Sequence, residues 1–191
     1  MANPTTAKLR VSRFDIVEST TTTWLTPKAW IKALGPFDLD PCTPPKMPWK
    51  TAKRMLTVQD DGLATPWPKK AFVFHNPPYG RGQEKWMKKA ADHGNGITLV
   101  LNRADTQWFQ TYVLKHPSVS AVLFIEGRVR FCYPDGRPSN MTCPVPAILV
   151  AYGEKAAKHL HQANKDGVVP GMLFRMNHDA NRSLVAIPSP T

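Results

Sequence analysis

Runs of apolar residues alternate with amphipathic stretches through the middle of this chain. Continuous apolar runs are typical of strands buried on both faces of a sheet, and they occupy residues 71–74, 97–101, 119–125 and 147–151. Two shorter patterns, at residues 37–40 and 55–58, are weaker strand candidates. Helices are predicted over residues 84–93, 106–115 and 154–164.

The order of these elements predicts an α/β fold with a mostly parallel sheet, because strands that alternate with helices pair in the same direction. No helix-length segment separates the last two strands, and residues 130–146 are turn-like, so the last strand is expected to be antiparallel. An earlier helix is predicted to begin with Thr26 as N-cap and Pro27 as its first residue, and to end at Gly35.

A length of 191 residues favours one domain, large enough to bury a core. The polar, threonine-rich segment 1–23 is expected to be a flexible lead-in, and residues 24–191 to form the single domain. Residues 188–191 are expected to form a frayed end. No apolar run has the length of a membrane span, and the first 30 residues lack a signal-peptide core, so a cytoplasmic protein is expected.

The chain is basic. Its 25 Lys and Arg exceed its 14 Asp and Glu, which gives a formal net charge of +11. An excess of this size favours a polyanionic partner such as DNA, although a merely basic, soluble surface would give the same count. Three cysteines without a CxxC spacing indicate reduced thiols and not a disulfide framework.

The most informative motif is Asn76-Pro77-Pro78-Tyr79, which directly follows the apolar run 71–74. Ligands of open α/β sheets bind where strands end in this way. The amide oxygen of Asn76 and the carbonyl of Pro77 can accept two N–H bonds from an exocyclic amino group, and Tyr79 offers a flat face for stacking. A rigid turn is the alternative interpretation. The residue types favour a site that methylates an amino nitrogen of a planar base.

A methyl donor such as S-adenosyl-L-methionine carries an ammonium group, ribose hydroxyls and an adenine amino group, all of which favour acidic or carbonyl partners. Acidic residues at two predicted strand ends are candidates, with Asp40 near the ammonium and Asp60 or Asp61 near the adenosine. Asp60-Asp61-Gly62 could instead be an acidic turn. No Gly-x-Gly follows Asp40, so Trp24 and Thr26 are expected to help shape the donor site.

Six short motifs together resemble the phage DNA N6-adenine methyltransferase family, often called Dam-like. They lie in family order between residues 24 and 152 and comprise Trp24-x-Thr26-Pro27, Phe37-Asp38-Leu39-Asp40-Pro41-Cys42, Asp60-Asp61-Gly62-Leu63 with Trp67, Asn76-Pro77-Pro78-Tyr79-Gly80, Asp105-x-x-Trp108-Phe109 and Gly127-Arg128-x-x-Phe131.

The resemblance implies a Rossmann-like class I methyltransferase fold, S-adenosyl-L-methionine as donor and DNA adenine as acceptor. It implies that Asn76 to Tyr79 form the catalytic motif and that Asp40, Pro41 and Cys42 belong to the donor pocket. Because an adenine inside a duplex is out of reach, it must be flipped out before direct methyl transfer.

Other assignments stay open in the sequence. Arg128 and Arg130 are either DNA contacts or structural ion-pair partners. The same catalytic tetrapeptide also serves enzymes that methylate glutamine amides in proteins or amino groups of RNA bases, and an inactive DNA-binding relative is a third class. No metal site is expected, because His159 and His161 would point apart on a helix. The sequence does not indicate an oligomeric state or a target sequence.

Overall fold

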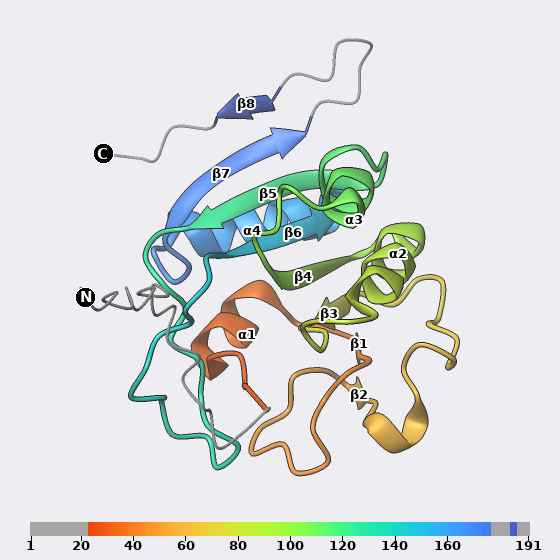
Figure 1. Ribbon diagram of the computed structural model, residues 1–191, viewed down its shortest axis with the longest axis vertical. Helices are drawn as coiled ribbons and strands as arrows, with labels where there is room; N and C mark the ends of the chain where they lie inside the picture. The colour runs from red at the N-terminus through yellow and green to blue at the C-terminus, as the bar shows by residue number, and fades with distance from the viewer. Residues whose placement is uncertain (1–22, 177–183, 187–191) are drawn as a thin grey trace, which may run out of the picture.

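The computed structural model describes residues 23–176 and 184–186, and it has a mixed α/β architecture (Figure 1). The predicted lead-in, apart from Thr23, and the predicted end at residues 188–191 lie outside the described residues. No helix in the described part is long and apolar enough to cross a membrane.

One eight-stranded sheet organises the molecule, in the order β2-β1-β3-β4-β6-β5-β7-β8. The pairs β2–β1, β1–β3 and β3–β4 are parallel, and the four remaining pairs are antiparallel. The strands are β1 (Leu39–Asp40), β2 (Arg54–Met55), β3 (Val73–His75), β4 (Gly96–Leu101), β5 (Val119–Ile125), β6 (Ala147–Tyr152), β7 (Gly171–Met176) and β8 (Leu184–Ala186).

The predicted antiparallel strand is confirmed as β6, but it is not the last one. It lies between β4 and β5, and two further antiparallel neighbours, β7 and β8, complete the sheet. The sequence pattern does not predict β7, because Gly171–Met176 contains Arg175 and is neither continuously apolar nor regularly alternating. Its pairing with the buried strand β5 stabilises it. The sheet is therefore parallel on one side and antiparallel on the other.

Helices cover both faces of the sheet, which explains the continuous apolar runs of its central strands. One core cluster combines Leu99 and Leu149 with residues of α1 and α4, and the other combines Val100 and Val150 with residues of α2 and η2. The helical segments are α1 (Lys28–Leu34), η1 (Val58–Asp60), α2 (Gln83–His93), α3 (Gln107–Phe109), η2 (Gln110–Leu114) and α4 (Glu154–Lys165).

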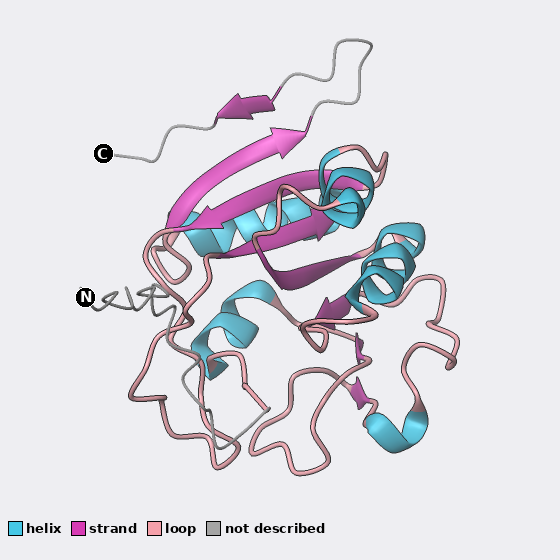
Figure 2. Ribbon diagram, viewed as in Figure 1, coloured by secondary structure: helices cyan, strands magenta, loops and turns pink. Residues whose placement is uncertain are grey.

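The first helix begins one residue later than predicted. Its N-cap position is Pro27, without a side-chain capping bond, so the prediction that Thr26 caps this helix is wrong. The side chain of Thr26 is only 3% exposed and turns into the molecule instead. In Figure 2, long loops occupy the part of the molecule around α1, β1 and β2, where the candidate site lies.

Candidate functional site

The four parallel strands end at one edge of the sheet, which brings the two main sequence candidates together. Asp40 is the last residue of β1, and Asn76 follows β3, the strand beside it. Cys42 connects them, since its main-chain N–H donates to Asp40 Oδ1 over 3.2 Å and its thiol donates to the main-chain oxygen of Asn76 over 3.2 Å. The predicted donor and acceptor residues therefore share one site.

The side-chain amide of Asn76 is held at both ends. Its Nδ2 atom donates to the main-chain oxygen of Trp24 and to Oγ1 of Thr26, each over 3.3 Å. Its Oδ1 atom accepts a hydrogen bond from the hydroxyl of Tyr79 over 2.7 Å. Since an amide oxygen has two lone pairs, one acceptor position remains at Oδ1.

The tetrapeptide Asn76-Pro77-Pro78-Tyr79 is only partly buried. Pro78 is exposed, Asn76 and Tyr79 are half-buried, and Pro77 is buried. No hydrogen bond to the carbonyl of Pro77 is present within the described residues. The ring of Tyr79 lies 6.5 Å from that of Phe131, and burial raises the pKa of its hydroxyl, which therefore remains a proton donor.

Asp40 is a buried carboxyl group, only 3% exposed, and no cation contacts it within the described residues. Burial raises its pKa from 3.8 to about 6, although hydrogen bonds, including one from the N–H of Cys42, favour the ionised form. A buried carboxylate without a counter-ion favours binding of a positively charged group.

Asp38, two residues earlier, has a structural role. It forms an ion pair with Lys53 over 2.8 Å and accepts a hydrogen bond from the N–H of Phe72 over 2.9 Å. These contacts lower its pKa, with the bond from Lys53 as the largest cause. Asp38 thus joins β1 to its neighbours, whereas Asp40 faces the site.

Asp60 and Asp61 are exposed, and their carboxylates make local bonds. Asp60 Oδ2 accepts the N–H and the hydroxyl of Thr57, over 2.8 and 2.9 Å, and Asp61 Oδ1 accepts the N–H groups of Leu63 and Ala64, each over 3.1 Å. These bonds have the form of the acidic turn that the sequence left open.

Gly62 places this acidic turn against the loop that follows β1. A Cβ atom at Gly62 would lie 1.9 Å from the main-chain oxygen of Pro41, so only glycine allows this approach. The ammonium of Lys89 donates to the carbonyls of Gly62, Leu63 and Thr65 over 3.1, 2.6 and 2.7 Å and holds the turn in place. The predicted candidates Asp60 and Asp61 therefore lie in a turn that packs beside Pro41.

Irregular segments of the chain contact one another at two places. Leu25 pairs with Cys132 through two main-chain hydrogen bonds of 2.9 and 2.8 Å, and the ring of Trp24 lies 5.9 Å from that of Tyr133. A Cβ atom at Gly136 would lie 3.0 Å from the ring of Trp49, so the segments 41–54 and 130–141 contact each other.

Arg128 and Arg130 are exposed on either side of the buried Val129. Neither guanidinium forms an ion pair with any residue that the structure describes. The described residues therefore give no support to the interpretation of these arginines as structural ion-pair partners. The arginines lie in the chain just before the segment that pairs with Leu25.

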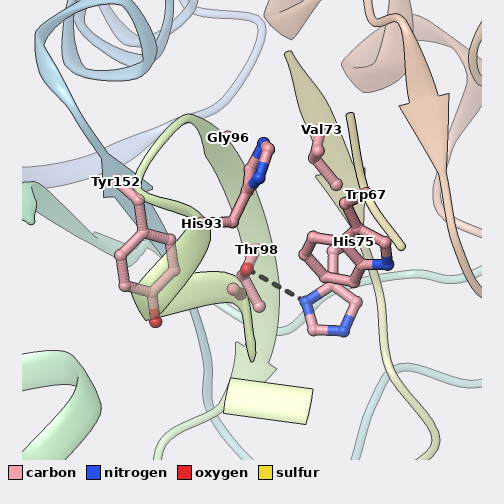
Figure 3. A pocket seen from close by; sticks show the side chains of 8 residues that line it. Trp67, Val73, His75, His93, Gly96, Thr98 and Tyr152 are labelled. Carbon is pink, nitrogen blue, oxygen red and sulfur yellow. Dashed lines mark hydrogen bonds between the residues drawn. The ribbon is translucent and has the colours of Figure 1, made fainter. Parts of the chain in front are cut away.

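His75 directly precedes the tetrapeptide and was not among the predicted site residues. It is 1% exposed, its Nδ1 atom lies 3.1 Å from Oγ1 of Thr98 (Figure 3), and burial lowers its pKa to about 3, so the ring is neutral. The side chains around it leave only a narrow gap without room for a water molecule, and none of the predicted site residues lines this gap, whose lining is Trp67, Val73, His75, Ala90, His93, Gly96, Thr98 and Tyr152.

Comparison with known proteins adds one strong finding. Residues 15–170 match the family model described as DNA N-6-adenine-methyltransferase (Dam). This match covers most of the chain and includes every sequence-predicted site residue. No curated protein and no solved structure matches the chain.

Proposed function

The chain belongs to the DNA N-6-adenine-methyltransferase (Dam) family, and on this premise we propose that it transfers a methyl group from S-adenosyl-L-methionine to the N6 atom of an adenine flipped out of duplex DNA. The observation that carries the proposal is the geometry of Asn76. Its amide oxygen lies at a strand end, keeps a free acceptor position and is oriented by fixed partners on the amide nitrogen.

The acceptor residues act on the amino group of the adenine. The lone pair of this nitrogen is delocalised into the ring, which makes it a poor nucleophile. Hydrogen bonds from its two N–H groups to Asn76 Oδ1 and to the carbonyl of Pro77 favour a pyramidal nitrogen and offset the positive charge that develops on it. The stiff Pro-Pro backbone holds both acceptors in place, and positioning supplies much of the remaining rate enhancement.

The flipped base also needs a surface to replace its lost stacking. Tyr79 is the proposed platform, and aromatic stacking of this kind stabilises a base by about 1–3 kcal/mol. In the structure the hydroxyl of Tyr79 donates to Asn76 Oδ1, so the two groups are already in contact before a base arrives. An incoming amino group would use the second lone pair of that oxygen or replace the Tyr79 hydroxyl.

The residues present fit a positively charged donor. Asp40 is a buried carboxyl group without a cationic partner in the described part. Cys42 links it to Asn76, because the main-chain N–H of Cys42 donates to Asp40 and its thiol donates to the main-chain oxygen of Asn76. When bound, S-adenosyl-L-methionine supplies an electrophilic methyl group on a positively charged sulfur. We propose that Asp40 binds the ammonium group, that Pro41 and Cys42 line the same pocket with Trp24 and Thr26 nearby, and that Asp60 or Asp61 serves the adenosine.

We propose that Arg128 and Arg130 contact DNA phosphates or base edges, because both are exposed and free of ion pairs to described residues. The formal charge of +11 supports a polyanionic substrate. We also propose a Rossmann-like class I methyltransferase fold in a single domain of residues 24–191, supported by parallel strands whose ends form the site. Because the substrate is DNA, we propose a cytoplasmic location in a bacterium or a phage-infected host cell.

Tritiated S-adenosyl-L-methionine tests this proposal directly. Incubation with duplex DNA, followed by digestion and chromatography, is expected to give label in N6-methyladenine. Parallel reactions with RNA and with protein extract represent the rival activities on RNA bases and glutamine amides. Label in either of those substrates but not in DNA, or no label in any substrate, would contradict the proposed function.

A further inference from the structure

Thr26 makes a contact that neither its predicted role at the helix start nor its predicted role at the donor explains. Its Oγ1 atom accepts one hydrogen bond from the amide nitrogen of the Asn76 side chain, and the main-chain oxygen of Trp24 accepts the other. We infer that Thr26 is a positioning residue for methyl transfer, which keeps the amide oxygen of Asn76 directed at the adenine amino group. This inference rests on the proposed acceptor role of Asn76.

The contact fixes which end of the amide faces the substrate. A main-chain carbonyl can only accept hydrogen bonds, so the atom of Asn76 that faces the carbonyl of Trp24 must be the nitrogen. The oxygen then points the opposite way, where the hydroxyl of Tyr79 reaches it over 2.7 Å. A flipped amide would place its oxygen against the carbonyl of Trp24 and would offer donors, not acceptors, to an amino group.

The segment that carries these acceptors is itself held by burial and main-chain hydrogen bonds. Leu25 lies between Trp24 and Thr26, is 2% exposed and pairs with Cys132 through two main-chain hydrogen bonds. Thr26 is 3% exposed and directly precedes Pro27 at the cap of α1. The acceptors of the amide nitrogen therefore belong to a segment that is buried at Leu25 and Thr26 and paired with Cys132, whereas Asn76 lies in a loop after β3.

The positioning role and a donor-binding role give different kinetics. Loss of the Thr26 hydroxyl would leave one amide proton of Asn76 unpaired and free the side chain to turn, which lowers kcat and leaves binding nearly intact. If Thr26 instead contacted the donor, loss of its hydroxyl would raise the Kd for S-adenosyl-L-methionine and leave kcat nearly unchanged at saturation.

The test compares Thr26→Val with Thr26→Ser in the full chain. Thr26→Val is expected to lower kcat for adenine methylation about tenfold or more, with the calorimetric Kd for S-adenosyl-L-methionine within about twofold of wild type. Thr26→Ser keeps the hydroxyl and is expected to stay within about threefold of wild-type kcat. Thr111→Val is the control for the substitution itself, because the hydroxyl of Thr111 also forms a hydrogen bond, as donor to the main-chain oxygen of Gln107, but lies in η2 away from the site.

A Thr26→Val variant with wild-type kcat would overturn the inference, as would a raised donor Kd at unchanged kcat. The proposed function fails separately, if the wild-type protein methylates no adenine or if Asn76→Ala remains active. Wild-type activity that is lost in Asn76→Ala but kept in Thr26→Val refutes the positioning role alone.

A measurement on the wild-type protein needs no Thr26 variant and decides the question if Thr26→Val does not fold. In nitrogen-15 spectra, the side-chain NH₂ signals of Asn76 are identified by their absence in Asn76→Ala. Exchange of both protons with water is expected to be at least about tenfold slower than exchange of the side-chain NH₂ protons of Asn140, which is exposed. Equal exchange rates would show that the two acceptors do not hold the amide.

Discussion

Replacement of Asp40 by Asn is expected to make the ligand-free protein more stable at neutral pH. The carboxyl group is 3% exposed, and burial raises its pKa from 3.8 to about 6. The ionised form is therefore disfavoured in the folded protein, so stability falls as pH rises from about 4 to about 6. One pH unit corresponds to about 1.4 kcal/mol, which gives a cost of about 3 kcal/mol above pH 6.

Urea denaturation between pH 4 and 8 measures this effect. The free energy of unfolding of Asp40→Asn is expected to equal that of wild type near pH 4 and to exceed it by about 3 kcal/mol at pH 7.5. His75, whose pKa is lowered to about 3, destabilises both proteins as pH falls below about 6.5, and this contribution cancels in the difference.

Asp38→Asn is the matched control, since the same substitution two residues away is expected to act in the opposite direction. Contacts with Lys53 and Phe72 lower the pKa of Asp38, so removal of its charge lowers stability at neutral pH. Asp40→Asn that is no more stable than wild type at pH 7.5 would refute the claim that this carboxylate lacks a counter-ion.

The donor is expected to remove most of this difference in stability. At a hundredfold excess over Kd, a ligand stabilises a folded protein by about 2.7 kcal/mol. Saturating S-adenosyl-L-methionine is expected to stabilise wild type by an amount of this order and Asp40→Asn much less. Equal stabilisation of both proteins would mean that Asp40 does not bind the donor.

Five further substitutions, at four positions, test other parts of the site. Arg128→Ala and Arg130→Ala are each expected to reduce the slope of log Kd for DNA against log salt by about 1, and unchanged slopes would exclude phosphate contacts. Tyr79→Ala is expected to lower kcat/KM about 5- to 150-fold through lost stacking, whereas Tyr79→Phe keeps the ring and stays within about threefold; equal losses would refute stacking. Gly62→Ala places a Cβ atom against the Pro41 carbonyl, so urea denaturation is expected to show a loss of about 3 kcal/mol, and an unchanged midpoint would refute this packing.

Much of the sheet could be predicted because its strands are buried on both faces. The continuous apolar pattern of residues 119–125 coincides with β5, and the predicted run 97–101 lies within β4. The position of Asn76 at a strand end also follows from sequence, since an apolar run precedes it directly. These features could be predicted because each depends on the residue types within one short stretch of the chain.

Features that depend on distant contacts could not be predicted. Thr26 has the residue types of a helix N-cap around it, but its contact with Asn76 joins positions 50 residues apart. β7 exists because β5 pairs with it, and the close approach of Gly62 to Pro41 depends on how two loops fold together. The contact between the Tyr79 hydroxyl and Asn76 Oδ1 joins residues only three positions apart, but it depends on the path of the loop between them, which the sequence pattern does not specify.

The most direct test of the central claim is turnover of Asn76→Ala on duplex DNA with tritiated S-adenosyl-L-methionine. Loss of the amide oxygen is expected to lower kcat for N6-methyladenine formation by about a thousandfold, while the calorimetric Kd for the donor stays within about twofold of wild type. Turnover close to that of the wild-type protein would contradict the account, because no acceptor role would then remain for Asn76.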